Sequence, residues 1–183
     1  MIWYIVSGLL LLVAIYLAGM YNAFVRLNNS VKEAFATMDV YLKKRWDLVP
    51  NLVDVVKSYA KHESGVLEHV TTLRSSSYAE MSARDKFDVN EKLAVGLSRL
   101  FALAENYPDL KANQNFSDLS ARLSRIEDEI ANARKYYNSA VKKLNIAVEM
   151  FPNNMVAKFF GFKQAQIFAA RADEKESVAV KLS

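Results

Sequence analysis

Few side chains in this sequence have the types and spacing that catalysis or metal binding requires. The 183 residues include no cysteine, which excludes disulfides, thiolate zinc sites and a cysteine nucleophile. The two histidines, His62 and His69, lie seven residues apart, about 10 Å along a helix, too far to share one metal without another ligand between them. Neither Glu63 nor Glu68 stands three residues before a histidine, as the Glu-x-x-His pairs of bundle metal sites require. We therefore expect no metal and no cofactor.

The familiar motifs of enzymes are also missing. The glycines, at positions 8, 19, 65, 96 and 161, are too widely spaced for a phosphate-binding loop. The sequence has no nucleophile elbow and no metalloprotease helix motif. A catalytic site would have to use carboxylates such as Asp39, Asp54 or Glu63, and carboxylates are more often solvated. We expect that the protein is not an enzyme.

A compact basic and aromatic cluster is the first candidate contact site. It consists of Lys43, Lys44, Arg45 and Trp46. Such a cluster could bind anionic lipid headgroups, with Trp46 at the interface. The alternative is a solvated helix end, where cations interact favourably with the last carbonyl groups.

A second candidate is the phenylalanine-rich segment 155–168, in particular Phe159, Phe160 and Phe162. These rings could enter a membrane or receive a protein partner. Aromatic residues at helical spacing more often belong to a core, so docking onto the rest of the domain is the alternative.

The composition favours long helices. The chain has 5 glycines and 3 prolines, where average usage predicts roughly 13 and 9, so it has few turns. Its formal net charge is +4, from 24 Lys and Arg against 20 Asp and Glu, and the two signs are interspersed. This mild excess suits the surface of an anionic membrane better than nucleic acid, so we expect no nucleic-acid partner.

Residues 1–25 carry no charged side chain and predict a transmembrane helix. About 20 helical residues cross the hydrocarbon layer of a bilayer. Aromatic residues mark both ends of this run, as in an interfacial belt: Trp3, Tyr4, Tyr21 and Phe24. A cleaved signal peptide would need a basic start and a small-residue cleavage site, and the sequence shows neither. Basic residues follow the span and none precedes it, which predicts an outer N-terminus and a cytoplasmic domain at the inner membrane.

Beyond the span the pattern remains helical. An apolar stripe from Leu27 to Leu42 could continue the span as one rod, with helical character up to Trp46. The run Asp47-Leu48-Val49-Pro50 interrupts it as a turn or a kink, and a second stripe runs from Leu52 to Leu73. Asp88 and Glu91 suggest a capping box for a third helix, which closes at Asn106-Tyr107-Pro108-Asp109.

The clearest element is a heptad seam from Phe116 to Phe151 that ends at Pro152. Alanines at 133, 140 and 147 would let a neighbouring helix approach closely. Together these patterns predict an all-α protein, in which an N-terminal transmembrane helix (1–25) precedes a long-helix four-helix bundle (26–170) and a charged tail (171–183).

Several runs of residues resemble the LemA family. Three long runs lie within residues 21–63: Tyr21 to Asp39, Leu42 to Val53 and Val56 to Glu63. Shorter runs follow: Tyr107-Pro108-Asp109-Leu110-Lys111-Ala112-Asn113 with Phe116, Ile130-Ala131-Asn132-Ala133-Arg134, Tyr137-Asn138, Phe151-Pro152 and Gly161-Phe162. Trp46 departs from the tyrosine expected there. The resemblance implies a membrane-anchored bundle of bromodomain-like, up-and-down topology, with a short outer N-terminus and a cytoplasmic domain. It implies no mechanism, although some relatives are associated with specialised membrane compartments in bacteria.

Two functional hypotheses follow. The first is a non-enzymatic scaffold that contacts membrane lipid and forms a homo-oligomer or recruits a protein partner. The second is a single-span sensor or signalling adaptor that couples the membrane to a cytoplasmic partner.

Overall fold

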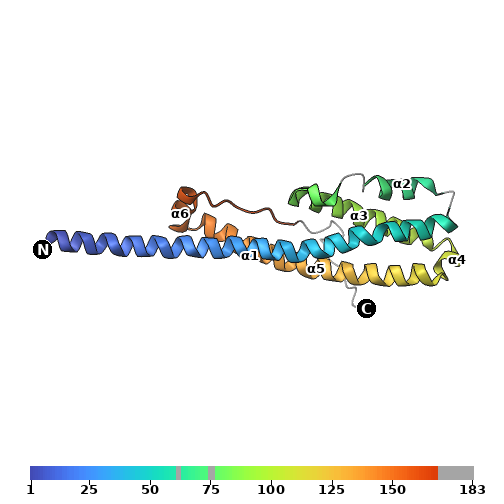
Figure 1. The fold of residues 1–183 in the computed structure, drawn as a ribbon, viewed down its shortest axis with the longest axis horizontal. Coiled ribbons are helices and arrows are strands. Elements are labelled where there is room, and N and C mark those ends of the chain that lie inside the picture. The colour runs from blue at the N-terminus through green and yellow to red at the C-terminus, as the bar shows by residue number, and fades with distance from the viewer. Residues whose placement is uncertain (61–62, 74–76, 169–183) are drawn as a thin grey trace, which may run out of the picture. The chain divides into compact units, whose positions relative to one another are not determined.

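The computed structural model describes residues 1–60, 63–73 and 77–168, which are helical almost throughout (Figure 1). These residues contain no strand. The elements are α1 (Ile2–Tyr59), α2 (Ser64–Thr72), the 3₁₀ helix η1 (Tyr78–Glu80), α3 (Ala83–Ala104), α4 (Pro108–Lys111), α5 (Gln114–Glu149) and α6 (Asn153–Phe160). The chain divides into two compact units. The first unit contains 1–38 and 133–168, and the described part of the second unit is 39–60, 63–73 and 77–132.

The start of α1 is apolar and is not covered by the protein. It includes an 18-residue stretch of mean hydropathy 2.2, of which none is buried. It is the one helix in the described part of the chain that is long and apolar enough to cross a membrane. Leaving one large aliphatic side chain in water costs about 1.5–3 kcal/mol relative to burial. This stretch is therefore compatible with the predicted membrane anchor.

Of the two alternatives predicted at Asp47–Pro50, the turn is wrong, because α1 runs through Pro50 to Tyr59. The kink stays a prediction. A proline inside a helix costs about 3 kcal/mol. Burial of apolar side chains on both sides of Pro50 offsets that cost. Val49, Leu52 and Val56 are fully buried, and each burial stabilises the fold by about 1.5–3 kcal/mol. The predicted second stripe is instead divided between the end of α1 and α2.

The predicted start of the third helix is also wrong. Helix α3 begins at Ala83, where Ser82 and Asp85 form the capping box: the Ser82 hydroxyl accepts from the Asp85 amide, and the Asp85 carboxylate accepts from the Ser82 amide. The first core residue of α3 is Phe87, which lies before the predicted cap at Asp88 and requires an earlier start. The predicted end of the third helix at Asn106–Asp109 is confirmed, since α3 ends at Ala104 and α4 begins at Pro108.

Helix α5 confirms the long seam. Within the first unit its buried seam positions include Ala133, Tyr137, Ala140 and Leu144. Phe35 of α1 lies edge-on to Tyr137, with ring centroids 6.1 Å apart. The last predicted seam position, Phe151, is wrong, because it is 76% exposed and falls after the end of the helix at Glu149.

Helix α6 ends at Phe160 and is capped by Gly161, whose φ of +76° is a left-handed conformation that glycine adopts without a Cβ penalty. The Phe162 amide then donates to the Ala157 carbonyl at 2.9 Å, which closes the helix end and turns the chain back. The following residues, 162–168, have no regular secondary structure.

The all-helical class is thus confirmed. The described residues form six α-helices, and the four-helix bundle of bromodomain-like topology stays a prediction. The predicted charged tail, 171–183, lies outside the described residues.

Candidate functional site

A buried arginine holds together the polar centre of the second unit. Arg45 is 2% exposed. Its Nη2 donates to the backbone carbonyl and to Oδ1 of Asn90, both at 2.7 Å, and its Nη1 donates to Glu127 Oε1 at 2.6 Å. The guanidinium therefore links α1, α3 and α5, and each of its charge-assisted bonds is stronger than a neutral hydrogen bond.

A second polar cluster surrounds Asp39. The Tyr78 hydroxyl and the Lys86 ammonium each donate to this carboxylate at 2.7 Å, and the ammonium also lies 4.7 Å from the centre of the Tyr78 ring. Burial of Tyr78 raises the pKa of its phenol well above the usual value, and the hydrogen bond to Asp39 raises this pKa further. The phenol is therefore a neutral donor rather than a base, and Asp39 is a structural acceptor.

The predicted basic cluster is split between core and surface. Arg45 and Trp46 are buried, and the Trp46 ring lies 5.3 Å from the ring of Tyr78. Lys43 and Lys44 are exposed, and Lys43 pairs with Asp47 one helical turn on. The structure thus places Arg45 and Trp46 in the core instead of at a lipid surface, because both continue the apolar stripe of α1. Lipid contact by Lys43 and Lys44 stays a prediction.

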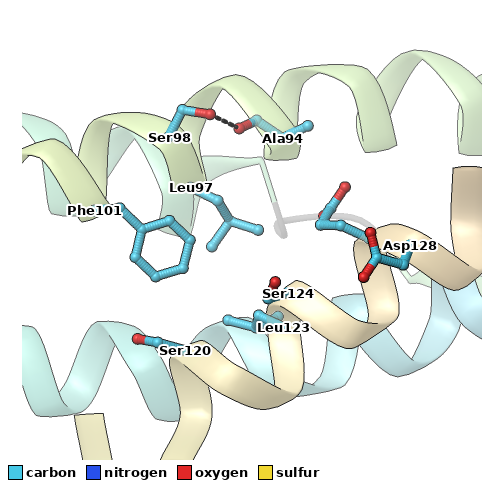
Figure 2. A pocket seen from close by; sticks show the side chains of 9 residues that line it. Ala94, Leu97, Ser98, Phe101, Ser120, Leu123, Ser124 and Asp128 are labelled. Carbon is cyan, nitrogen blue, oxygen red and sulfur yellow. Dashed lines mark hydrogen bonds between the residues drawn. The ribbon is translucent and has the colours of Figure 1, made fainter. Parts of the chain in front are cut away.

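An open cavity of about 440 Å³ lies between α3 and α5 of the second unit (Figure 2). Leu97 and Phe101 point from α3 toward Leu123 of α5 and give the cavity an apolar wall. Glu127 and Asp128 line it as carboxylates. The Ser120 hydroxyl is buried beside these residues and has no hydrogen-bond partner within the described structure.

The chemistry of this cavity suits binding of an apolar group. Its hydroxyls belong to Ser98, Ser120 and Ser124, and its carboxylates to Glu127 and Asp128. Its apolar wall, formed by Leu97, Phe101 and Leu123, is the part that suits an apolar group. Among the described residues, no group of three His, Cys, Asp or Glu side chains could hold a metal ion. His62 lies outside the described residues, and His69 is exposed.

In the first unit, two asparagines of α5 hold the segment that follows α6. Asn145 bonds to both the amide and the carbonyl of Ala165, at 2.8 and 3.0 Å. Asn138 bonds to the amide and the carbonyl of Phe168 in the same way, at 2.9 and 2.8 Å. Asn138 and Asn145 are seven helical residues apart, about 10.5 Å along α5. Ala165 and Phe168 are three extended residues apart, about 10 Å, so the two spacings match.

Aromatic rings gather where the apolar run of α1 ends. Phe162 stacks on Phe24 at a centroid distance of 5.0 Å, and Tyr21 lies 4.9 Å from Phe160. Of the four predicted membrane-interface residues, Trp3 and Tyr4 are more than 80% exposed, Tyr21 is 39% exposed and Phe24 is buried in this cluster. Phe162 thus docks on α1, while Phe159 is 83% exposed.

A model of the LemA family matches residues 34–182. The chain belongs to the LemA family. The match includes most of α1 beyond its apolar start and all of α2 to α6.

Curated relatives of this LemA-family protein come from bacteria. Magnetosome protein MamQ 2 of Paramagnetospirillum magneticum is 25% identical over 174 residues, and magnetosome protein MamQ of Magnetospirillum gryphiswaldense is 24% identical. Each alignment covers 81% of this chain, which spans 64% of the length of either MamQ protein. Protein LemA of Metamycoplasma hominis is 26% identical over 161 residues, with 87% of this chain and 74% of the relative covered.

Sequence reasoning missed the polar contacts that position these elements. The signal for Arg45 was present, because it stands at a stripe position between Leu42 and Val49. The asparagine pair had a weaker signal, the seven-residue spacing of Asn138 and Asn145 beside the seam.

Replacing Arg45 with alanine should destabilise the LemA-family protein strongly. The substitution removes the donor to Asn90 and the ion pair to Glu127, which should lower the free energy of unfolding by about 3 kcal/mol or more. For a chain of this size we expect the thermal midpoint of unfolding to fall by roughly 6–12 °C. The midpoint is measured in mild detergent by circular dichroism. The matched control is Lys44→Ala at the adjacent exposed position, which should change stability by no more than about 0.5 kcal/mol. Equal effects of the two variants would contradict this role of Arg45.

Replacing Asn145 with alanine should loosen the segment after α6 without unfolding α5. Two hydrogen bonds are lost, worth about 1 kcal/mol each. Hydrogen exchange at the Ala165 amide should become about tenfold faster or more. Asn132→Ala, at an exposed position of the same helix, is the control and should leave that amide unchanged. Unaltered exchange in Asn145→Ala would rule out the proposed clamp.

Proposed function

We propose that this LemA-family protein is a non-enzymatic scaffold, anchored in the bacterial inner membrane by α1, that self-associates or recruits a protein partner. The main observation that supports the membrane anchor is the apolar stretch at the start of α1, none of which is buried. A chain of this kind can leave that surface in lipid without exposing backbone polar groups, because a helix satisfies them internally.

The charge distribution supports a cytoplasmic location for the folded part. Residues 1–38 and 133–168 contain eight Lys and Arg against two acidic residues, Glu33 and Glu149, a net charge of +6. The rest of the chain has sixteen basic and eighteen acidic residues, a net charge of −2. Positive residues that follow a span favour the cytoplasmic side, which would leave the N-terminus outside.

The scaffold role is supported by the chemistry of the folded part. Its buried polar groups, around Arg45 and Asp39, bond to one another and join helices. Its open cavity between α3 and α5 has an apolar wall that suits a side chain of another molecule. The names of the MamQ relatives refer to the magnetosome, which fits a role in membrane organisation.

The mass of the full-length protein in lipid nanodiscs or mild detergent tests the scaffold. We expect light scattering to give a discrete multiple of the chain mass, because self-association is the simplest way for a single-span protein to organise a membrane. A strict monomer that also captures no protein by crosslinking in cells would contradict the proposal. A monomer that crosslinks to one defined protein would keep recruitment and remove self-association.

The alternative is a signalling adaptor, and the continuity of α1 favours it. A single helix from Ile2 to Tyr59 joins the apolar stretch to core residues without a flexible connection.

Two matched insertions between Gly19 and Met20 separate the adaptor from the scaffold. Four glycines would break the helix, whereas four alanines would extend it by the same number of residues. An adaptor should complement a deletion strain only with the alanine insertion. A scaffold should complement with both or with neither, and that result would exclude the adaptor.

A further inference from the structure

We propose that α6 rests on the surface of the membrane, with Met155 and Phe159 inserted among anionic lipid headgroups. The inference depends on the proposed function, because it requires that the start of α1 crosses the bilayer. It assigns to α6 a lipid contact that is separate from the span itself.

The position of α6 follows from the length of the span. Residues 2–20 rise about 30 Å as a helix, which equals the thickness of the hydrocarbon layer. Tyr21 and Phe24 therefore lie at headgroup level on the side of the folded part. Since Phe160 and Phe162 contact these two rings at about 5 Å, α6 lies at the same level (Figure 1).

The exposed face of α6 has the chemistry of an interfacial helix. Val156 and Ala157 are buried against the first unit, whereas Met155 and Phe159, one turn apart, are 65% and 83% exposed. Lys158 is exposed beside Phe159, where its long side chain can reach the phosphate level. Phe151, which precedes the helix, is also exposed.

The charge around α6 matches an anionic lipid surface. The first unit carries a net charge of +6, and its exposed cations near this end of the molecule include Arg26, Lys158 and Lys163. Basic residues close to a membrane that contains anionic lipid are attracted to it within a Debye length. This complementarity favours lipid over a second copy of the chain, because two such units would repel each other.

Single-cysteine spin labels test the contact, since the chain has no cysteine of its own. Labels are placed in the full-length protein at Leu10 in the apolar run, at Met155 on α6 and at Ser139, an exposed position of α5 that serves as the water-facing control. The protein is reconstituted at high dilution into vesicles of phosphatidylcholine and phosphatidylglycerol. Collision with oxygen, which concentrates in lipid, is compared with collision with a water-soluble nickel complex.

We expect the oxygen-to-nickel collision ratio at Met155 to exceed that at Ser139 several-fold and to remain below that at Leu10. Phe159→Asp should lower the ratio at Met155 toward that at Ser139, with no change at Leu10. Vesicles of phosphatidylcholine alone should also lower the ratio at Met155. A ratio that is the same in both kinds of vesicle would remove the anionic lipid from the proposal.

Equal ratios at Met155 and Ser139, with Leu10 in lipid, would overturn the proposal while leaving the anchor intact. Shielding of Met155 from both reagents, with spin–spin broadening, would also overturn it and would show that another copy covers α6. Exposure of Leu10 to the nickel complex would instead refute the membrane anchor of the proposed function.

Discussion

The start of α1 presents an apolar surface that the rest of the described chain leaves unburied, and this surface is compatible with a membrane anchor. None of the 18-residue apolar stretch is buried, yet the same helix supplies Ala34, Met38, Leu42 and Val49 to the core. One element thus carries an exposed apolar stretch and a buried one in succession. In the proposed membrane-anchored state, such a helix needs no linker at the membrane surface, and its backbone hydrogen bonds continue from lipid into the protein.

Polar contacts then fix which helices pack on α1 in the second unit. Arg45 reaches Asn90 and Glu127, and Asp39 accepts from Tyr78 and Lys86. A buried charge left without partners is costly, so alternative packings that separate these groups are disfavoured. In the first unit the asparagines of α5 satisfy the backbone of the segment after α6, which has no strand or helix partners of its own. The polar groups thus specify the arrangement that the apolar stripes make stable.

The sequence was sufficient to predict what depends on period and length. The N-terminal apolar helix, the helical class and the seam of α5 follow from uninterrupted apolar spacing, and the LemA resemblance follows from long ordered motifs. The path through Pro50 was not predictable, because local propensity opposes it and tertiary burial of Val49 and Leu52 decides it. Arg45 stands at a stripe position between Leu42 and Val49, which indicated burial, but the partners that make a buried charge tolerable, Asn90 and Glu127, come from distant helices and were not predictable. The exposure of Phe159 next to the docked Phe162 likewise depends on the left-handed turn at Gly161.

The continuity of α1 from lipid into the core is the central claim, and amide hydrogen exchange of the full-length protein in lipid nanodiscs tests it most directly. We expect continuous protection of the backbone from the apolar run through Pro50 to about Val56, with rapid exchange only near the helix ends. A rapidly exchanging segment between Gly19 and Val31, or around Asp47–Asn51, would show a flexible joint and would contradict it.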